Sequence, residues 1–424
     1  MNPSDLWAAP QALGPLTAVV ALPGSKSVTN RMLVLAALAD GLSRIRRPLR
    51  SRDTELMAAA LRVLGAGVDD PGDGDWLVDG GVLRARGDRI DVGNAGTVAR
   101  FLPPVAMLTS GSVVFDGDPR VRERPLGPLL AALRSLGGKL DRVDALPVRV
   151  TGHGSLPGGQ VTLDASASSQ LISGLLLSAP RFDEGLAVRH AGPPLPSAPH
   201  LSMTVDALRA AGAVVTVGPD QWSVEPGPLQ PRDVVVEPDL STAAAYLAAP
   251  LLAGGSVTIP DWPTSTTQPG AVLPQLLADM GARVSHSEGR MTVAAGAELR
   301  GLDVDLRDAG ELTPVLAALA CFASGPSSLR GVAHLRVQET DRLAALVTEL
   351  TALGGDVREL PDGLAIRPRP LHGGTFRTYD DHRIAMAGAV VGLGVAGVEV
   401  EDIATTRKTV PDFAGSWTRM LGRS

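Results

Sequence analysis

The sequence predicts a two-domain α/β protein assembled from six similar units of about 70 residues each. One observation is a short phrase that recurs along the 424 residues, a helix-like run followed by Gly, two small or polar residues and Val or Leu. A second is a set of uniformly apolar helical runs with the same spacing, which predicts buried helices. A third is the content of 48 Gly and 34 Pro, which predicts many tight connections.

The glycine of the recurring phrase marks each unit, because it falls between an amphipathic run and the next β-like stretch. The six glycines are Gly65, Gly137, Gly212, Gly281, Gly354 and Gly422. The spacing is nearly constant over the whole chain, so the sequence predicts six copies of one unit.

Each unit is expected to contain a buried helix, a strand, a loop, a surface helix and a strand, with room for one more strand. Apolar runs predict buried helices that begin near Ser27, Gly96, Ser169, Ser241, Glu311 and His382. Amphipathic runs predict surface helices over 56–64, 129–136, 205–211, 272–280 and 343–353. β-like stretches predict strands near 112–117, 186–191, 256–261, 327–332 and 398–403.

Units of this size are too long for a solenoid, so two globular halves of three units each are expected. The midpoint of the chain falls near residues 236–239. If the N-terminal strand before Pro23 joins the later units, the chain crosses between the domains twice. The predicted domains are then 24–237 for units one to three and 1–23 plus 238–424 for units four to six.

The composition excludes several classes of protein. A net charge of −6 argues against a general binder of nucleic acid or of anionic membranes. The single cysteine, Cys321, excludes a disulfide framework and a multi-cysteine metal site, and it favours a cytoplasmic location. The first ten residues lack the features of a signal peptide. The apolar stretches 240–260 and 384–398 are interpreted as buried helices, because one is interrupted by polar residues, Pro and Gly and the other is too short to span a bilayer.

Polar and charged residues collect in the first turns of the apolar helices. Ser, Thr, Asn and Asp at such positions have an ordinary explanation as helix caps. Cations such as Lys26, Arg31 and Arg383 do not, because a positive charge in the first turn opposes the helix dipole. An anion above the helix start would offset that cost. Several such helix starts brought together predict a site for a small polyanion.

Motifs for other chemistries are absent or misplaced. Residues 392–397 fit GxGxxG, but they end a helix and precede a strand, the reverse of the dinucleotide-binding context. The sequence has no P-loop, no HExxH, no clustered His and Cys, and no nucleophile elbow. No metal site is therefore expected.

Seven segments, in order along the chain, carry a resemblance to a known family. They are LPGSKSVTNR (22–31), GNAGTVAR (93–100), DPRVRERPLG (118–127), SSQ (168–170), ETDRL (339–343), DDHRIAM (380–386) and RKTVPDF (407–413). Together they resemble the 5-enolpyruvylshikimate-3-phosphate synthases. The resemblance implies two domains, each of three βαβαββ units, with the N-termini of the buried helices facing an interdomain cleft that holds the active site and closes on its ligands.

The resemblance also implies an activity. The enolpyruvyl group of phosphoenolpyruvate would be transferred to the 5-hydroxyl of shikimate 3-phosphate through a tetrahedral intermediate, with release of phosphate, in the biosynthesis of chorismate and the aromatic amino acids. It implies no metal and no organic cofactor. A cytoplasmic monomer that binds neither nucleic acid nor membranes is expected.

The site residues are carried over from the matching motifs. The implied contacts of shikimate 3-phosphate are Lys26, Ser27, Arg31, Ser168, Ser169, Gln170, Ser197, Glu311, His334 and Gln338. The implied contacts of phosphoenolpyruvate are Lys26, Asn94, Gly96, Arg124, Gln170, Arg342, Arg383 and Lys408. Glu311 is the candidate base for the attacking hydroxyl and Glu339 the candidate acid for the methylene carbon, while Lys26 and Lys408 would stabilise developing charge and take part in proton transfer.

Four positions depart from the pattern common in the family. Glu311 stands where Asp is frequent, Gln338 where Lys is frequent, His334 where Asn is frequent and His200 where Tyr is common. The carboxylate at 311 is kept with a longer reach, whereas the change at 338 removes one contact with the substrate phosphate or a hydroxyl.

Three other functions compete with this interpretation. A transferase acting on UDP-N-acetylglucosamine shares the fold but generally carries a cysteine in the loop of unit two, which here (116–120) has none. A protein related to RNA 3′-phosphate cyclases is disfavoured by the acidic charge. A non-catalytic anion-binding homologue is disfavoured by the presence of both Glu311 and Glu339.

Lysine is scarce, with only Lys26, Lys139 and Lys408 among the 39 basic residues. Two of the three fall in the motifs, so we expect Lys to be kept where Arg would not serve. Lys139 follows a repeat glycine and is expected to be a surface charge.

Overall fold

The computed structural model describes residues 6–423, and these form two compact units. One is continuous and comprises Gly24–Val236; we call it the central unit. The other, the terminal unit, combines the described residues of Met1–Pro23 and Glu237–Ser424. The chain passes between the units twice, after Pro23 and after Val236. Residues 1–5 and 424 of the predicted domain 1–23 plus 238–424 lie outside the described residues.

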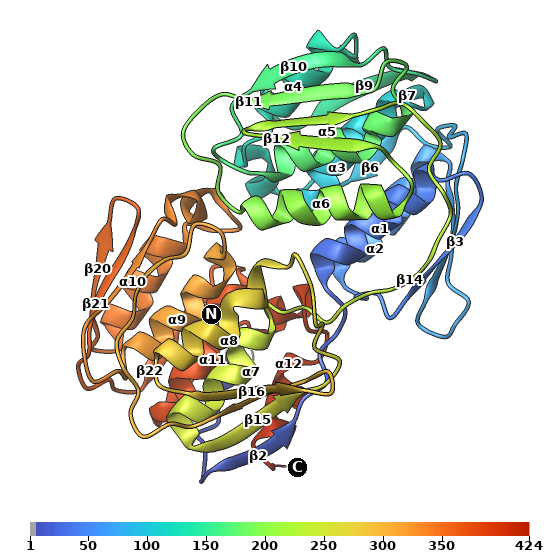
Figure 1. Ribbon diagram of the computed structural model, residues 1–424. Helices are drawn as coiled ribbons and strands as arrows, with labels where there is room; N and C mark the ends of the chain where they lie inside the picture. The colour runs from blue at the N-terminus through green and yellow to red at the C-terminus, as the bar shows by residue number, and fades with distance from the viewer. Residues whose placement is uncertain (1–5, 424) are drawn as a thin grey trace. The chain divides into compact units, whose positions relative to one another are not determined.

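The central unit alternates helices and short strands (Figure 1). Its helices are α1 (Lys26–Leu38), α2 (Arg52–Leu64), α3 (Gly96–Met107), α4 (Gly127–Ser135), α5 (Gln170–Ser178) and α6 (Ala198–Ala210), with 3-10 turns η2 (Pro119–Glu123) and η3 (Ala179–Arg181). Its strands are β3 (Leu42–Arg46), β4 (Gly67–Asp69), β5 (Trp76–Asp79), β6 (Arg89–Asp91), β7 (Ser110–Asp116), β8 (Lys139–Leu140), β9 (Val148–His153), β10 (Gly159–Leu163), β11 (Leu186–His190), β12 (Val215–Gly218), β13 (Gln221–Val224) and β14 (Asp233–Val235).

The terminal unit uses the same kinds of element. Its helices are α7 (Ala243–Ala253), α8 (Leu273–Asp279), α9 (Thr313–Ala320), α10 (Arg342–Ala352), α11 (His382–Gly394) and α12 (Phe413–Met420), with 3-10 turns η4 (Pro269–Val272), η5 (Gly310–Leu312), η6 (Ala333–Val337) and η7 (Ile403–Lys408). Its strands are β1 (Leu6–Ala8), β2 (Leu16–Val19), β15 (Gly255–Ile259), β16 (Arg283–Ser287), β17 (Arg290–Ala294), β18 (Asp303–Asp305), β19 (Ser327–Arg330), β20 (Asp356–Leu360), β21 (Gly363–Arg367), β22 (Gly374–Phe376) and β23 (Val398–Glu401).

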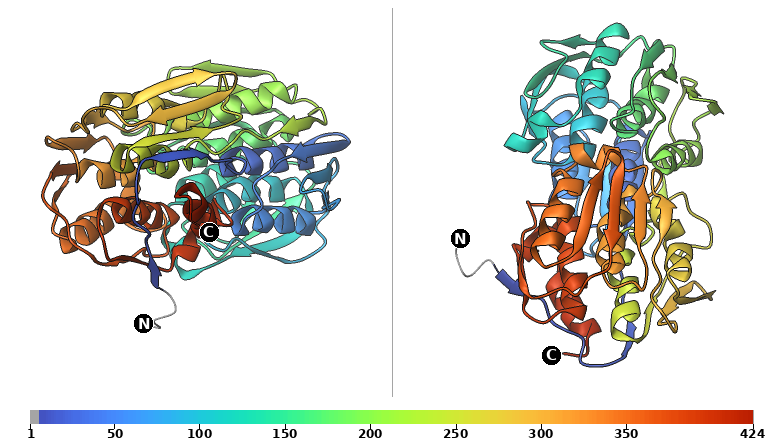
Figure 2. Two further views of the ribbon diagram at one scale, coloured as in Figure 1. Left: turned by 90° about the horizontal axis from the view of Figure 1, so that it is seen from below. Right: turned by 90° about the vertical axis from the view of Figure 1, so that its left-hand side faces the viewer.

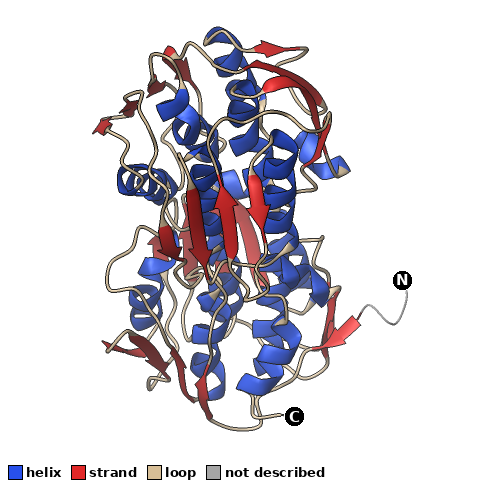
Figure 3. Cartoon of the chain, turned by 90° about the vertical axis from the view of Figure 1, so that its right-hand side faces the viewer, coloured by secondary structure: helices blue, strands red, loops and turns tan. Residues whose placement is uncertain are grey.

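Five four-stranded sheets in the described residues share one arrangement, a parallel pair followed by two antiparallel neighbours. In the sheet β6-β7-β9-β8, for example, Ile90 lies opposite Phe115 in the parallel pair, and Val113 lies opposite Val150 in the antiparallel pair. The three-stranded sheet β1-β23-β22 keeps the parallel pair and takes its third strand from the beginning of the chain. Figure 3 shows one sheet nearly face-on, with helices behind it.

Segments far apart in sequence complete each unit. In the central unit β14 joins β3 in parallel, with Val234 opposite Ile45. In the terminal unit β2 joins β15, and β1 joins β23 with Leu6 opposite Glu401. Both views in Figure 2 show the beginning of the chain beside its red C-terminal part. The terminal unit is therefore held together by pairing between the two ends of the chain.

Three mutually contacting helices form the centre of each unit, α1, α3 and α5 in one and α7, α9 and α11 in the other. All 12 residues of α3 are buried, as are all eight of α9. These helices are apolar on every side because every side meets protein, as the sequence predicts. Burying a leucine such as Leu316 stabilises the fold by about 1.5–3 kcal/mol.

The six repeat glycines share one backbone conformation. Their φ angles lie between 68° and 110°, the left-handed region that favours glycine after the end of a helix. At Gly65 there is also no room for a side chain, because a Cβ atom would lie 2.3 Å from the carbonyl oxygen of Arg84. The recurring phrase thus records one turn, repeated after each surface helix.

Two predicted boundaries are wrong. The helix expected over 205–211 begins at Ala198, because Pro199 in the first turn suits a helix start and His200, Leu201 and Met203 are buried. The helix expected over 56–64 also begins earlier, at Arg52, because Ser51 and Thr54 form a capping box there. The helix expected near Glu311 does begin there, with the 3-10 turn η5 that α9 continues. Among the described helices, none combines the length and the apolarity needed to cross a membrane.

Candidate active site

In the central unit, the first turns of the three buried helices are connected by side-chain hydrogen bonds. Asn30 of α1 donates from Nδ2 to Oγ1 of Thr97 in α3, at 2.7 Å. Arg100 of α3 donates from Nη1 to Oε1 of Gln170, the first residue of α5, at 3.2 Å. The helix starts that the sequence marks as chemically unusual therefore lie together within this unit. We call them, with their loops, the central cluster.

Gly96 is surrounded by guanidinium groups. A Cβ atom on this residue would lie 2.5 Å from Nη1 of Arg100 and 2.8 Å from Nη2 of Arg124. Glycine is needed here because any larger residue would push these nitrogens away. Two cations thus converge at the N-terminus of α3, where backbone N–H groups also favour an anion.

Backbone carbonyls orient both of these arginines. Arg124 donates from Nη1 to the carbonyl oxygen of Asn94 at 3.0 Å and to its Oδ1 at 3.3 Å. Arg100 donates from Nη2 to the carbonyl oxygen of Pro125 at 3.1 Å. The side chains come from α3 and from the residue directly after η2, so two adjacent segments fix one pair of cations.

Lys26, the first residue of α1, lies at the edge of this cluster. Its Nζ is 3.3 Å from Oδ2 of Asp53, which is buried in the first turn of α2. The Lys26 side chain is 16 % exposed, so the ammonium keeps access to solvent. Ser25 caps α1 by accepting a hydrogen bond from the backbone of Val28.

Arg31 lies beneath the surface, with 0 % exposure. Its guanidinium donates to Oγ1 of Thr204 and to the carbonyl oxygens of Ser27 and His200, at 2.8, 2.9 and 2.9 Å. It also lies over the ring of Phe101, 5.2 Å from the centroid. Burial lowers the pKa of Arg31 to about 9, so the group is still protonated at neutral pH. Arg31 therefore fixes the backbone of Ser27 and His200, and its predicted contact with a substrate stays a prediction.

The polar site residues of the third sequence repeat lie on two loops of the central unit. Ser168 accepts a hydrogen bond at Oγ from the backbone of Gln170, at 3.3 Å, and Ser169 is buried directly before α5. Ser197 precedes α6 in the left-handed conformation, with φ 55°. His200 follows it in the first turn of α6.

In the terminal unit, Arg342 is the centre of a buried ionic network, the terminal cluster. Its Nε is 2.8 Å from Oδ2 of Asp381, and its Nη2 is 3.1 Å from Oε2 of Glu339. Burial alone would lower the pKa of Arg342, but the charges of Asp381 and Glu339 outweigh it and raise that pKa. Asp381 is fully buried and caps α11 by accepting from the backbone of Arg383 at 2.8 Å.

Glu339 joins this network to Lys408. The two atoms, Oε1 of Glu339 and Nζ of Lys408, are 2.9 Å apart, and both side chains are largely buried. Glu339 follows η6 and precedes α10, whereas Lys408 ends η7. One carboxylate therefore bridges an arginine and a lysine that are 66 residues apart in the sequence.

The remaining predicted residues surround this network. Nη2 of Arg383 is 3.8 Å from Oδ1 of Asp239, which lies just before α7. The charge of Glu311, in η5, contributes to the raised pKa of Arg342. His334 packs on the same turn, since a Cβ atom at Gly310 would lie 2.7 Å from its Nε2. Gln338 directly follows η6 and is partly exposed.

Several residues of the clusters were not predicted as site residues, among them Arg100, Asp53 and Asp381. For Arg100 the signal was present, because it lies one helical turn after Gly96 and so on the same face of α3. Asp381 was recognisable only as a helix cap. The position of Asp53 beside Lys26 depends on how α1 and α2 pack, which no local pattern encodes.

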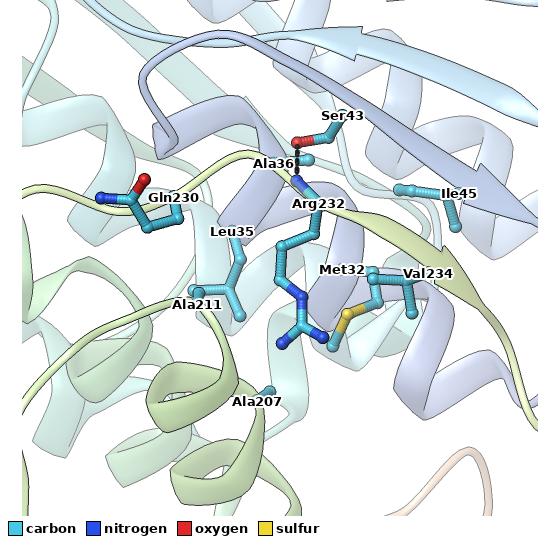
Figure 4. A pocket seen from close by; sticks show the side chains of 10 residues that line it. All are labelled: Met32, Leu35, Ala36, Ser43, Ile45, Ala207, Ala211, Gln230, Arg232 and Val234. Carbon is cyan, nitrogen blue, oxygen red and sulfur yellow. Dashed lines mark hydrogen bonds between the residues drawn. The ribbon is translucent and has the colours of Figure 1, made fainter.

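One pocket of the central unit has a different character (Figure 4). It is lined mainly by apolar side chains between α1, α6, β3 and β14, and the backbone of Arg232 donates to Oγ of Ser43 at its edge, at 3.1 Å. Its cavity volume of about 20 Å³ has room for one water molecule rather than a substrate. It includes none of the predicted site residues.

Within residues 6–423, no group of three or more His, Cys, Asp or Glu side chains is arranged to hold a metal ion. Cys321 is buried at the end of α9, and burial raises the pKa of its thiol to about 12. A neutral buried thiol is a poor nucleophile. The side chains present at the two clusters include arginines, lysines and carboxylates, together with serines, a glutamine and a histidine.

Comparison with known proteins agrees with this chemistry. The family model "EPSP synthase (3-phosphoshikimate 1-carboxyvinyltransferase)" matches residues 10–417. A 3-phosphoshikimate 1-carboxyvinyltransferase of Kocuria rhizophila is 55% identical over 433 residues, covering 99% of this chain and 97% of that protein. An EPSP synthase structure from Acinetobacter baumannii is 25% identical, covers 98% of both chains and has a TM-score of 0.82.

A more distant structure, the enolpyruvyl transferase NikO from Streptomyces tendae, shares the fold. It is 22% identical, covers 98% of this chain and 97% of its own, and has a TM-score of 0.76. The family model spans nearly the whole chain and the Kocuria rhizophila relative exceeds half identity. This chain therefore belongs to the EPSP synthase family of transferases, as its motifs predict.

Proposed function

We propose that the protein transfers the enolpyruvyl group of phosphoenolpyruvate to the 5-hydroxyl of shikimate 3-phosphate and releases phosphate, in the pathway that leads to chorismate and the aromatic amino acids. The observation that carries the proposal is the bridge from Arg342 through Glu339 to Lys408. It places a carboxylate that can accept a proton beside an ammonium group and beside a guanidinium group whose N–H bonds suit an anion. Family membership supports the same reaction.

Phosphoenolpyruvate is held in this proposal by cations from both clusters. Arg124 and Lys26 of the central cluster and Arg342, Arg383 and Lys408 of the terminal cluster bind its carboxylate and phosphate. Guanidinium groups suit both anions, because two parallel N–H bonds match two oxygens. Gly96 allows close approach of the backbone, Asn94 orients Arg124, and Gln170 contacts the ligand from α5.

Shikimate 3-phosphate is held mainly by hydroxyl and amide groups. Ser168, Ser169 and Ser197 offer donors to the 3-phosphate, and Ser27, Lys26 and Gln170 contact the carboxylate and hydroxyls. Arg31 acts one layer below by fixing the backbone of Ser27 and His200. From the terminal unit, Glu311, His334 and Gln338 contact the hydroxyls and the phosphate.

The addition step moves one proton away from the hydroxyl and another to carbon. Glu311 accepts the proton of the 5-hydroxyl while the hydroxyl oxygen bonds to C2 of phosphoenolpyruvate. A proton from the Glu339–Lys408 pair goes to C3, which becomes a methyl group. The 2.9 Å separation of the pair supports this role, because a proton can pass directly from ammonium to carboxylate.

The elimination step removes a proton from C3, which reverses the proton transfer of the addition step. The C2–O bond to phosphate breaks in the tetrahedral intermediate, and a methyl proton returns through Glu339 to Lys408. Phosphate leaves with the proton that Glu311 had taken, so each group ends in its starting state. Lys26 and Lys408 stabilise the charge that develops on the leaving phosphate.

Neither cluster carries all of these groups. We therefore propose that the active site forms between the domains 24–237 and 1–23 plus 238–424 and that ligand binding brings the clusters together. We propose a cytoplasmic monomer that needs no metal or organic cofactor and binds neither nucleic acid nor membranes.

Transfer to a UDP-linked amino sugar is the nearest alternative, and two features disfavour it. The loop 116–120 has no cysteine, and Cys321 is buried with a raised pKa. The 55% identity to a 3-phosphoshikimate 1-carboxyvinyltransferase also favours the shikimate acceptor.

The test is phosphate release by the purified protein with each acceptor in turn. Release that requires both phosphoenolpyruvate and shikimate 3-phosphate is expected, together with formation of the enol ether seen by ¹H NMR. Release that requires the UDP-sugar instead would overturn the proposal. Binding of either anion without turnover would favour a non-catalytic homologue.

A further inference from the structure

One buried histidine lies where two loops of the central cluster meet. His190 is the last residue of β11, and β11 runs parallel to β10 with His190 opposite Leu163. The ends of the two strands therefore leave the sheet at the same edge. The loop after β10 leads to Ser168, Ser169 and Gln170, and the loop after β11 leads to Ser197.

The imidazole of His190 is hydrogen-bonded to both loops. Its Nδ1 lies 3.2 Å from the backbone nitrogen of Ala165, and its Nε2 lies 2.8 Å from the carbonyl oxygen of Pro193. A backbone N–H can only donate and a carbonyl can only accept. The partners thus fix a neutral ring that accepts at Nδ1 and donates from Nε2.

Other contacts bring the same two segments close. The backbone nitrogen of Ala191 donates to the carbonyl oxygen of Leu163 at 3.0 Å. A Cβ atom at Gly192 would lie 2.4 Å from Oδ1 of Asp164, and that oxygen accepts from the backbone of Ser166 at 2.8 Å. The ring of His190 adds a side-chain link between the loops beyond this point.

We propose that His190 is a positioning residue for the 3-phosphate, and that its neutral imidazole keeps the loop carrying Ser168 and Ser169 at a fixed distance from Ser197. This inference rests on the proposed function, which assigns those serines to shikimate 3-phosphate. His190 itself contacts no substrate in the proposal.

A pH dependence follows from the hydrogen bonds. Protonation would place an N–H at Nδ1, opposite the N–H of Ala165, and the link to that loop would be lost. Charged residues on the surrounding elements include Asp164 after β10, Arg189 on β11 and Asp220, whose carbonyl accepts from the backbone of His190 at 2.8 Å. Hydrogen bonds from Ser166, and to a smaller extent the charge of His190, lower the pKa of Asp164. An ionised Asp164 attracts the protonated ring but cannot replace the lost acceptor.

Two variants separate positioning from general loss of structure. In His190→Gln the amide oxygen can accept from Ala165 and the amide nitrogen can donate to Pro193, but the side chain does not titrate. His190→Ala removes both bonds. His153→Gln is the matched control, since His153 is exposed on β9 of the same unit.

The measurement is the Kd of shikimate 3-phosphate and of shikimate by calorimetry at pH 8 and pH 5.5. For His190→Ala at pH 8 we expect the preference for the phosphorylated ligand to fall about tenfold, whereas His190→Gln and His153→Gln stay near the wild type. From pH 8 to pH 5.5 the wild type should lose more of this preference than His190→Gln. The substrate and the other histidines titrate in both proteins, so the difference between the two proteins reports on His190 alone.

The outcomes are distinct. An unchanged preference in His190→Ala, or equal acid weakening in the wild type and His190→Gln, overturns the positioning role. Failure of the wild type to bind shikimate 3-phosphate at all would refute the proposed function instead. In that case, or if His190→Ala does not fold, amide hydrogen exchange decides. The protection factor of the Ala165 amide in the wild type, divided by that in His190→Gln, should fall from pH 8 to pH 5.5. An equal ratio at both pH values would overturn the link between His190 and Ala165.

Discussion

The arginines of the two clusters are held by different kinds of acceptor. Among the hydrogen bonds described above, Arg31, Arg100 and Arg124 of the central cluster donate to backbone carbonyls, to a threonine hydroxyl and to amide oxygens, which are neutral acceptors. In the terminal cluster, Arg342 donates to the carboxylates of Asp381 and Glu339.

This difference has a chemical consequence. A neutral acceptor fixes the direction of a guanidinium group without cancelling its charge, so the central cluster is suited to hold an anion by charge and shape. A carboxylate cancels the charge and can also carry a proton, so the terminal cluster is suited to proton transfer. The comparison predicts binding defects from changes in the first cluster and rate defects from changes in the second.

Glu339→Gln should give the largest effect. The amide keeps the shape of the side chain but cannot exchange a proton with Lys408 or balance Arg342, so we expect kcat to fall about 10²–10⁴-fold. Steady-state kinetics at saturating substrates measure the change, and circular dichroism checks that the variant is folded. A variant that keeps full kcat would remove Glu339 from proton transfer and break the comparison.

Lys408→Arg should give the next largest effect. Arginine keeps the charge beside Glu339 but does not release a proton near neutral pH, so kcat should fall about 10²-fold with a smaller change in KM. Lys139→Arg is the control, because Lys139 is exposed on β8 and should be silent. A silent Lys408→Arg would show that charge alone is needed there. Lys26→Arg allows the same test in the central cluster.

Gly96→Ala should alter binding more than rate. The added Cβ must displace Nη atoms of Arg100 and Arg124 that would lie within 2.8 Å of it, so we expect the KM for phosphoenolpyruvate to rise about tenfold and kcat to change less. A fall in kcat with unchanged KM would contradict the assignment of this cluster to anion binding.

Glu349→Gln should affect stability and leave the chemistry nearly unchanged. Glu349 is buried in α10 and accepts from the Tyr379 hydroxyl at 2.5 Å and from the backbone of Arg377 at 2.9 Å, and this holds the turn before Asp381. One acceptor is lost in the variant, so the free energy of unfolding should fall by about 1–3 kcal/mol. Denaturant unfolding measures it, and a change in kcat without a change in stability would contradict this role.

The same contact predicts a pH dependence in the alkaline range. Burial, together with Glu349, raises the pKa of Tyr379 to about 12. The folded protein therefore keeps this proton above the pH at which the unfolded chain loses it, so stability should fall between pH 10 and about 12. The fall should be smaller in Glu349→Gln, and equal pH profiles for the two proteins would disprove the coupling.

The periodic part of the structure was predictable from sequence because it is set locally. Apolar runs such as α3 and glycines with left-handed φ such as Gly65 follow from the periodicity and from backbone geometry. The start of α6 was not predicted because polar residues alternate with apolar ones before Val205, so the buried face of the helix is not evident from the sequence there. The partnership of Lys26 with Asp53 depends on helix packing, and the role of His190 depends on two loops that meet at the edge of a sheet. No local pattern contains that information.

The pairing of the chain's first strands with its later ones has a consequence for biosynthesis. Gly24–Val236 holds all of its own strands, so this unit can pack as soon as it has left the ribosome. Leu16–Val19 must wait for Gly255–Ile259, and Leu6–Ala8 must wait for Val398–Glu401. The terminal unit therefore completes its sheets last, after the central unit has left the ribosome. A nascent chain truncated before Val398 would leave its first strand without the edge that it joins.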